Sequence, residues 1–434
     1  MSELEIGFAV LTISVLLFGA HVLGYIFEKM HQPRLIGEIL AGVLLGPFVL
    51  GKVLPSAFQT LFPQANAVVN STGVVLNFIY WLGLLFLMFI SGSETRGLMA
   101  KENRRATAWI VGVGTPIPFF LVLALGLAAC LPLDYIVGTA GDRTAALLIV
   151  SIAVAVTSIP VISRIFQELG ILHTRFASLI LGSSVIEDII LWAVLAIATA
   201  LVGSATRSQQ YVIDTITSHM AATLLYTGAG LFLAPLLLKK LHSLPWNLLK
   251  KASATGYTLF ILFGYGAVAA LLKVNLAFAA FLAGYGLVGG MSGSERDQFQ
   301  ESLVAVSKVA LAIFIPLYFV MVGYKLIWGR EFSLLMLAVF LLGSTLLCFL
   351  SVGFAAKLGG FRGLDILNIT LVCNARGGPG IVLASIAYEN GIINGAFYTT
   401  LVLTAIITSQ VAGFWLKWVI RNQWPLLSET SKAV

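Results

Sequence analysis

The sequence predicts an all-α multi-pass membrane protein with about 13 transmembrane helices, built as two inverted six-helix repeats. Three observations lead to this fold class: the composition, the succession of long apolar segments, and two segments interrupted near their middle. The chain of 434 residues is 59% hydrophobic and only 10% charged, whereas soluble proteins carry about 25% charged residues. Its 26 basic and 19 acidic side chains are too few to cover a soluble protein of this size.

The apolar segments follow one another with short polar connections, and most approach the roughly 20 residues that a helix needs to cross a bilayer. They divide naturally into six spans, one span and six further spans. We expect them at roughly residues 6–27, 35–50, 70–91, 105–131, 145–164, 174–202, 220–238, 254–272, 274–290, 303–324, 331–357, 364–388 and 395–420.

The distribution of Lys and Arg between the loops predicts the orientation. If the N-terminus is outside, 18 of the 26 basic residues lie on the inner side and six on the outer side. Loops that stay in the cytoplasm carry such an excess of basic residues. We therefore expect a multi-pass plasma-membrane protein with its N-terminus outside and its C-terminus in the cytoplasm.

Two spans contain helix-breaking residues near their middle, and each is the fifth helix of its six. Span five is interrupted at Ala155–Pro160 and span twelve at Asn374–Gly380. The second set of six begins seven spans after the first, and because seven is odd the two halves have opposite orientations in the membrane. Broken helices at corresponding positions of inverted repeats indicate a binding site near the bilayer midplane. The alternative is that both are ordinary proline kinks.

Two adjacent acids, Glu187 and Asp188, lie near the centre of the span expected at 174–202. A charged side chain at the bilayer centre costs about 2.5–3.5 kcal/mol on insertion scales, so neither acid can face lipid. Adjacent residues of a helix point about 100° apart. This allows one acid to bind a transported ion while the other pairs with a basic group. The alternative is a structural buried ion pair.

Arg376 lies at the break of span twelve. It could balance the carboxylates or the exposed ends of the half-helices, or it could serve only as a structural cap. The sequence contains no His-Glu-x-x-His or Cys-x-x-Cys motif, no phosphate-binding Gly-rich loop, and no Ser/His/Asp set that could meet at one depth. We therefore expect no enzyme activity, no cofactor and no nucleic-acid partner.

Several motifs together resemble the monovalent cation:proton antiporter-2 family. Gln32–Pro47 resembles its entry signature, and Ser91–Arg96 resembles its next landmark. Thr157–Gly170 and the Glu187-Asp188 pair are similar to the crossing helix and the carboxylate helix of its bacterial sodium/proton antiporters, and Ala375–Gly377 looks like the second crossing helix. The resemblance extends over roughly residues 28–420.

The resemblance implies an inverted-repeat fold with two crossing broken helices. It implies a homodimer in the lipid bilayer, in a bacterial inner membrane. It divides the chain into scaffold and dimerisation helices 1–3 at 1–104, core helices 4–6 at 105–203, linker helix 7 at 220–251, scaffold helices 8–10 at 252–325 and core helices 11–13 at 331–421.

The resemblance also implies roles for individual residues. Asp188 matches the essential carboxylate that binds both cation and proton, and Glu187 takes the place of a second acid or an Asn. Thr157 and Ser158 match the unwound stretch that faces the carboxylate. Lys357 is the basic candidate in span eleven for pairing with Glu187. The expected cation ligands are thus Asp188, Glu187, Thr157 and Ser158, and the expected charge-balancing residues are Arg376 and Lys357.

These expectations define a function. The predicted protein is a secondary active antiporter in which a monovalent cation, Na⁺ or K⁺, competes with a proton for a midplane carboxylate. Two alternatives remain at this point: a sodium-coupled symporter of a small organic anion, and a non-transporting membrane sensor or channel. The sequence does not choose among Na⁺, K⁺ and Li⁺, and it leaves the stoichiometry open.

Overall fold

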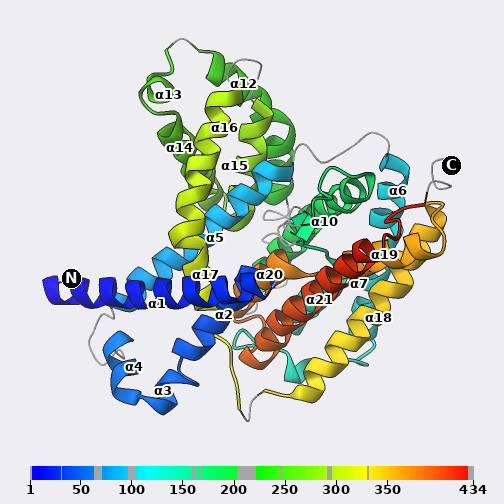
Figure 1. The fold of residues 1–434 in the computed structure, drawn as a ribbon, viewed down its shortest axis with the longest axis horizontal. Coiled ribbons are helices and arrows are strands. Elements are labelled where there is room, and N and C mark those ends of the chain that lie inside the picture. Colours follow the sequence, from blue (N-terminus) through cyan, green and yellow to red (C-terminus); the bar gives the residue numbers. More distant parts are fainter. Residues whose placement is uncertain are drawn as a thin grey trace. The chain divides into compact units, whose positions relative to one another are not determined.

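The structure is a computed structural model that describes residues 2–30, 32–62, 71–95, 103–158, 162–163, 165–166, 169–202, 221–244, 246–290, 296–329 and 332–428 (Figure 1). Three sequence features lie partly or wholly outside these residues. They are Arg96 of the motif Ser91–Arg96, residues 159–160 of the first break, and residues 159–161, 164 and 167–168 of the motif Thr157–Gly170.

The described chain separates into two compact units. The first contains residues 1–94 and 226–328, and the second contains residues 95–225 and 329–434. Each unit is therefore assembled from two distant parts of the sequence.

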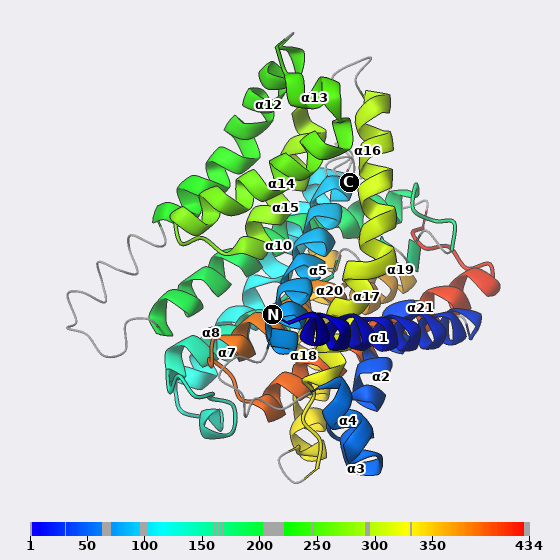
Figure 2. The same ribbon diagram turned by 90° about the vertical axis from the view of Figure 1, so that its left-hand side faces the viewer.

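The helices of the first unit include three long spans from the N-terminal part of the chain and four from its middle. Their bounds are α1 Glu3–Lys29, α2 Arg34–Leu45, α3 Leu50–Val53, α4 Pro55–Leu61, α5 Ser71–Thr95, η4 Ala229–Leu233, α12 Ala234–Ser243, α13 Leu248–Ala252, α14 Ala254–Leu271, α15 Leu276–Gly290, α16 Arg296–Val309, η6 Ala310–Phe314 and α17 Ile315–Tyr324. Helices α12, α14 and α15 lie side by side (Figure 2).

The second unit contains both predicted broken helices. Its elements are α6 Arg104–Trp109, η2 Ile110–Gly114, α7 Pro116–Leu127, η3 Leu133–Tyr135, α8 Arg143–Ala155, α10 Arg175–Val202, α18 Leu334–Leu358, α19 Leu364–Cys373, α20 Gly377–Glu389 and α21 Gly395–Arg421. Helices α18, α19 and α21 pack against one another (Figure 1).

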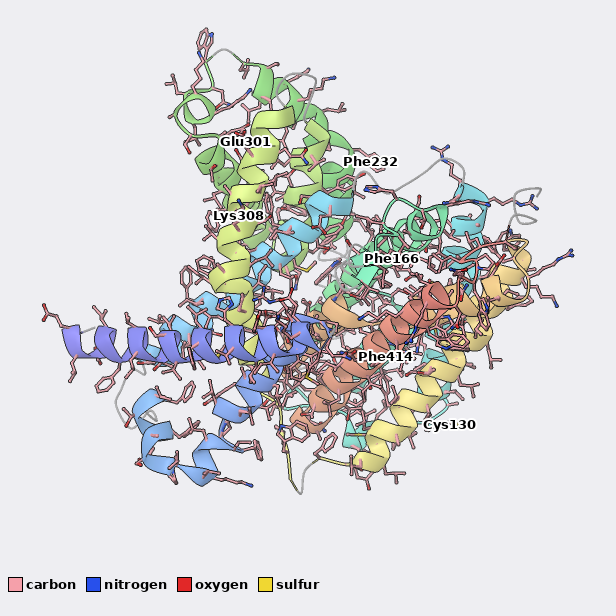
Figure 3. All side chains as sticks on the ribbon, viewed as in Figure 1. Cys130, Phe166, Phe232, Glu301, Lys308 and Phe414 are labelled. Carbon is pink, nitrogen blue, oxygen red and sulfur yellow. The ribbon has the colours of Figure 1, made fainter. Side chains whose placement is uncertain are left out.

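Eleven helices of the described chain are long and apolar enough to cross a membrane, and the two shorter apolar helices Arg143–Ala155 and Leu276–Gly290 coincide with two further predicted spans. Large apolar side chains project outward, as Phe232 and Phe414 do at 75% and 61% exposure (Figure 3). A lipid environment solvates such side chains. The predicted all-α multi-pass fold is confirmed.

Glycines bring pairs of helices into close contact within the first unit. A Cβ atom at Gly42 of α2 or at Gly323 of α17 would lie far inside the van der Waals distance from a carbonyl oxygen of the other helix. Gly92 of α5 and Gly284 of α15 form a second reciprocal pair of the same kind. Small residues let membrane helices approach this closely, so that van der Waals contacts hold them together without a hydrophobic driving force.

Three spans of the described chain contain a π-turn that ends one residue short of a proline. The turns η2, η4 and η6 precede Pro116, Pro235 and Pro316. A proline lacks the N–H that would bond the carbonyl four residues earlier and its ring crowds that carbonyl, and a π-turn is one way for a helix to accommodate the change. In the third case the carbonyl is that of Ala312, which accepts a 2.8 Å hydrogen bond from His21 Nε2 instead.

Candidate functional site

Both predicted breaks exist in the second unit. Helix α8 ends at Ala155, and Val156 has the extended backbone angles φ −107° and ψ 143°. Helix α19 ends at Cys373, and α20 begins at Gly377. The continuous span from Leu364 to Glu389 is therefore two half-helices, and 89% of its most apolar stretch is buried within the protein. Such an interruption is tolerated at membrane depth only where protein or water surrounds it.

The two breaks are hydrogen-bonded to each other. Thr157 Oγ1 donates to the carbonyl oxygen of Cys373 at 2.7 Å, and the N–H of Ser158 donates to the carbonyl oxygen of Ala375 at 2.8 Å. In the opposite direction, the N–H of Gly378 donates to Ser158 Oγ at 3.0 Å. Each break thus supplies partners for backbone groups that the ends of the other half-helices leave unsatisfied.

Glu187 is held by hydroxyl and amide donors from two other segments. Its side chain is 2% exposed on α10. Oε1 accepts a 2.8 Å hydrogen bond from Thr115 Oγ1, and Oε2 accepts a 3.1 Å hydrogen bond from the N–H of Thr157. Both carboxylate oxygens are therefore engaged by the protein itself.

Asp188 is in a different situation, although it is the next residue of the same helix. Its side chain is fully buried, and within the described part of the chain neither Oδ1 nor Oδ2 has a hydrogen-bond partner. An ionised carboxylate left bare in a protein interior costs several kcal/mol. Protonation or a positively charged partner would remove this cost.

The guanidinium of Arg376 lies across the ends of the two half-helices. Nη1 donates to Ser344 Oγ at 2.6 Å, and Nη2 donates to the carbonyl oxygen of Val154 at 3.4 Å and to Asn374 Oδ1 at 3.3 Å. Val154 belongs to the last turn of α8, and Asn374 is the C-cap of α19. The C-terminal end of a helix carries a partial negative charge, so a cation stabilises both ends.

Hydroxyl groups of α21 bind the backbone at the same break. The N–H of Arg376 donates to Thr408 Oγ1 at 3.4 Å, and the N–H of Gly377 donates to Ser409 Oγ at 3.2 Å. Gly377 has φ +23°, a backbone conformation that a residue with a Cβ rarely adopts. Glycine is therefore required where the chain turns from the break into α20.

The family model described as "Sodium/hydrogen exchanger, transmembrane" matches residues 13–422. This match includes both broken helices and the two acids of α10. The chain belongs to the sodium/hydrogen exchanger family. The family suggested by the sequence motifs is thereby confirmed.

Curated relatives in this exchanger family come from plants, yeast and bacteria. Cation/H(+) antiporter 18 of Arabidopsis thaliana is 25% identical over 417 residues, which are 93% of this chain and 48% of the plant protein. K(+)/H(+) antiporter 1 of Saccharomyces cerevisiae is 27% identical over 89% of this chain and 43% of its own length. The chain thus spans about half the length of these relatives. Na(+)/H(+)-K(+) antiporter GerN of Bacillus cereus is 23% identical, with 94% of this chain and 95% of GerN covered.

A solved structure supports the fold of this exchanger-family chain. The sodium proton antiporter MjNhaP1 of Methanocaldococcus jannaschii superposes with a TM-score of 0.66 at 16% identity, covering 96% of this chain and 98% of the other. At this identity the likeness concerns the fold. It agrees with the all-α membrane architecture expected from the sequence.

The structure does not bring Lys357 to Glu187. Lys357 is exposed in the last turn of α18, whereas Glu187 is buried with Thr115 and Thr157 as its hydrogen-bond partners. Among the described residues, no ion pair joins Lys357 or Arg376 to either acid. A lysine at the end of a membrane helix extends toward water, where its charge is solvated.

Sequence reasoning missed four side chains of the site: Thr115, Ser344, Thr408 and Ser409. Hydroxyl residues are common in membrane helices, and most bond a carbonyl of their own helix. For Thr115 one signal was present, because this threonine directly precedes Pro116 in an apolar span. Ser344, Thr408 and Ser409 carry no comparable local signal.

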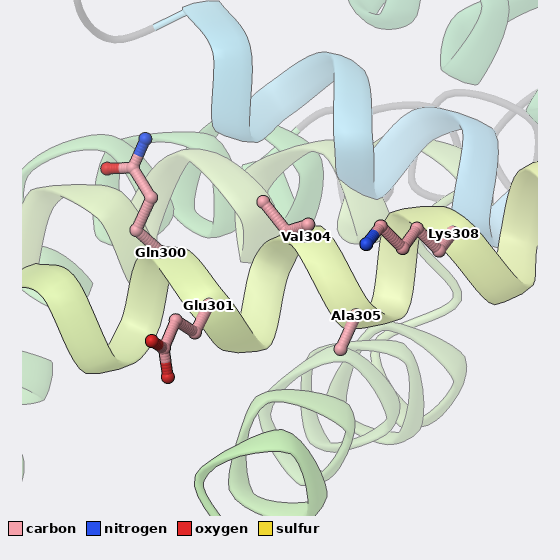
Figure 4. A pocket seen from close by; sticks show the side chains of 5 residues that line it. All are labelled: Gln300, Glu301, Val304, Ala305 and Lys308. Carbon is pink, nitrogen blue, oxygen red and sulfur yellow. The ribbon is translucent and has the colours of Figure 1, made fainter.

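A surface hollow of about 450 Å³ lies along α16 in the first unit (Figure 4). Its lining contains none of the residues expected to bind the cation. The lining residues are Gln300, Glu301, Val304, Ala305 and Lys308, all on one helix.

Proposed function

We propose that this protein is a secondary active antiporter that exchanges a monovalent cation, Na⁺ or K⁺, for H⁺ at Asp188. One observation carries the proposal: Asp188 is fully buried, and both of its carboxylate oxygens lack a protein partner among the described residues. In the low-dielectric interior this carboxylate needs one positive ligand at a time. A proton and a cation therefore compete for it, and such competition is the basis of exchange.

The oxygen atoms around the two breaks have the chemistry that a hard cation prefers. Na⁺ and K⁺ bind carboxylate, hydroxyl and carbonyl oxygens. Asp188 would supply the anionic ligand, with Thr157 and Ser158 as expected neutral ligands on the adjacent break. Glu187 would be the second carboxylate of the site. When Asp188 is neutralised by either ligand, the site can pass the low-dielectric barrier, whereas the bare anion cannot.

The separation of the chain into two compact units supports the proposal that one set of helices is a scaffold and the other a transporting core. The second unit contains the helices expected as core, and the first contains those expected as scaffold together with residues of the linker helix from Tyr226 onward. We propose that the protein is a homodimer in a bacterial plasma membrane with its N-terminus outside. The excess of basic residues on the other side supports this orientation.

The proposal is tested with purified protein in proteoliposomes that carry an imposed pH gradient and a pH-sensitive dye. Addition of Na⁺, K⁺ or Li⁺ to separate samples should collapse the gradient for the transported ions in the wild type. Asp188→Asn should abolish this response. Asp365→Asn is a matched control, because Asp365 is also buried but its two oxygens are bound by Ser428. This control should retain exchange.

Normal exchange by Asp188→Asn would refute the proposal. Cation flux without proton movement would favour the channel or the symporter. Repeating the assay with and without an imposed voltage measures whether net charge moves in each cycle.

A further inference from the structure

Thr115 differs from most hydroxyl residues in the described helices of this protein. Ser151, Ser183 and Thr370 each donate to the carbonyl four residues earlier in the same helix. Thr115 is also buried, but its Oγ1 donates 2.8 Å across to Glu187 Oε1 on α10. This hydroxyl therefore makes a tertiary contact to one of the two midplane acids.

The π-turn η2 and Pro116 explain this direction. The N–H of Thr115 bonds the carbonyl oxygen of Ile110, five residues earlier, at 3.2 Å. A π-turn inserts one extra residue into the helix, so the residues after it are rotated by about 100° relative to a regular α-helix. Thr115 lies directly after this turn. Its side-chain direction is thus set by the local irregularity of the helix.

Glu187 also accepts a hydrogen bond from the first break, so it connects Thr115 to that break. Its other oxygen, Oε2, accepts the N–H of Thr157, a residue that α8 no longer includes. Thr157 Oγ1 in turn donates to the carbonyl oxygen of Cys373 in the second break. One chain of hydrogen bonds therefore runs from the end of η2 through α10 to both breaks.

We propose that Thr115 is a positioning residue that orients Glu187, and through Glu187 holds the Thr157 break in the geometry that Asp188 needs to bind its cation. This inference rests on the proposed function of Asp188. A glutamate has three rotatable side-chain torsions. With one donor removed, Glu187 is less restrained and so is the backbone N–H that it binds.

The first test compares Thr115→Val, which removes the hydroxyl at nearly constant shape, with Thr115→Ser, which keeps it. Thr258→Val is the matched control, because Thr258 is fully buried and its Oγ1 donates to Ala254 in its own helix. In proteoliposomes, Thr115→Val should lower kcat/KM for the transported cation about tenfold, mainly through KM. Thr115→Ser should restore it, and Thr258→Val should match the wild type.

The second test is hydrogen–deuterium exchange of the peptide that contains Thr157, read by mass spectrometry on detergent-purified protein. Thr115→Val should speed exchange there, and Thr258→Val should not. A wild-type KM in Thr115→Val, unchanged exchange at this peptide, or no rescue by serine would each overturn the inference. Failure of Thr115→Val alone to yield folded protein would show a merely structural role and would overturn the inference as well.

Asp188→Asn tests the proposed function separately. If it abolishes transport while Thr115→Val behaves like the wild type, only the inference about Thr115 fails.

Discussion

Arg376 offers a sharp test of how the two broken helices are stabilised. Its guanidinium donates to Ser344 Oγ, to the carbonyl oxygen of Val154 and to Asn374 Oδ1, and thereby joins α18 to the ends of α8 and α19. Arg376→Gln removes the charge and shortens the side chain. Arg376→Lys keeps the charge but replaces a planar fork by a single point donor.

The magnitude follows from the three hydrogen bonds. Interhelical hydrogen bonds in membrane proteins contribute on average about 0.6 kcal/mol and at most about 1.7 kcal/mol each. Because Arg376 is buried and charged, its bonds should lie toward the upper value, and the two helix ends add about 0.3–1 kcal/mol each. We expect Arg376→Gln to lower the free energy of unfolding by about 4–7 kcal/mol, and Arg376→Lys to lie between Gln and the wild type.

The assay is unfolding of the detergent-purified protein, followed by fluorescence-detected size-exclusion chromatography over a temperature series. Arg421→Gln is the matched control, because Arg421 is exposed in the last turn of α21. It should unfold close to the wild-type temperature. If Arg376→Gln unfolds together with Arg421→Gln, the guanidinium does not hold the half-helices and the reasoning is wrong.

Two further predictions concern the first unit and Lys357. Gly323→Ala should destabilise the protein by about 1–3 kcal/mol or more, because its Cβ would overlap the backbone of α2. Gly343→Ala, whose Cβ would meet nothing within 4 Å, should be neutral or slightly stabilising in the same melting assay. Lys357→Ala should keep proteoliposome exchange at the wild-type rate, since the lysine is exposed and forms no ion pair with Glu187 among the described residues. A loss as severe as that of Asp188→Asn would instead give Lys357 a role in transport.

The positions of the spans and of both breaks were predictable because each depends on a local property. A run of apolar residues is sufficient to place a helix in lipid. The breaks at 156–158 and 374–376 follow polar and helix-breaking residues that are close together in the sequence. The short helices α8 and α15 also coincide with predicted spans, although they are shorter than the others.

The partners of the site residues were less accessible to sequence reasoning. Thr115 meets Glu187 from 72 positions away, and Ser344 meets Arg376 from 32 positions away. The direction of Thr115 depends on a π-turn, which changes the face of every residue that follows it. For Arg376, the sequence left open whether it balances carboxylates or caps helix ends. The observed bonds of its side chain are to helix ends and to a serine.

By itself, the sequence determined that this protein lies in a membrane, the approximate order of its helices, and the position of its two acids near the centre of a span. These properties follow from hydrophobicity and helix breaking, which depend on neighbouring residues. It could not separate Glu187 from Asp188 by their surroundings. Only the tertiary structure decided that Glu187 receives two protein donors while Asp188 receives none from the described residues. The physical reason is that adjacent side chains point about 100° apart on a helix, and their partners come from other helices.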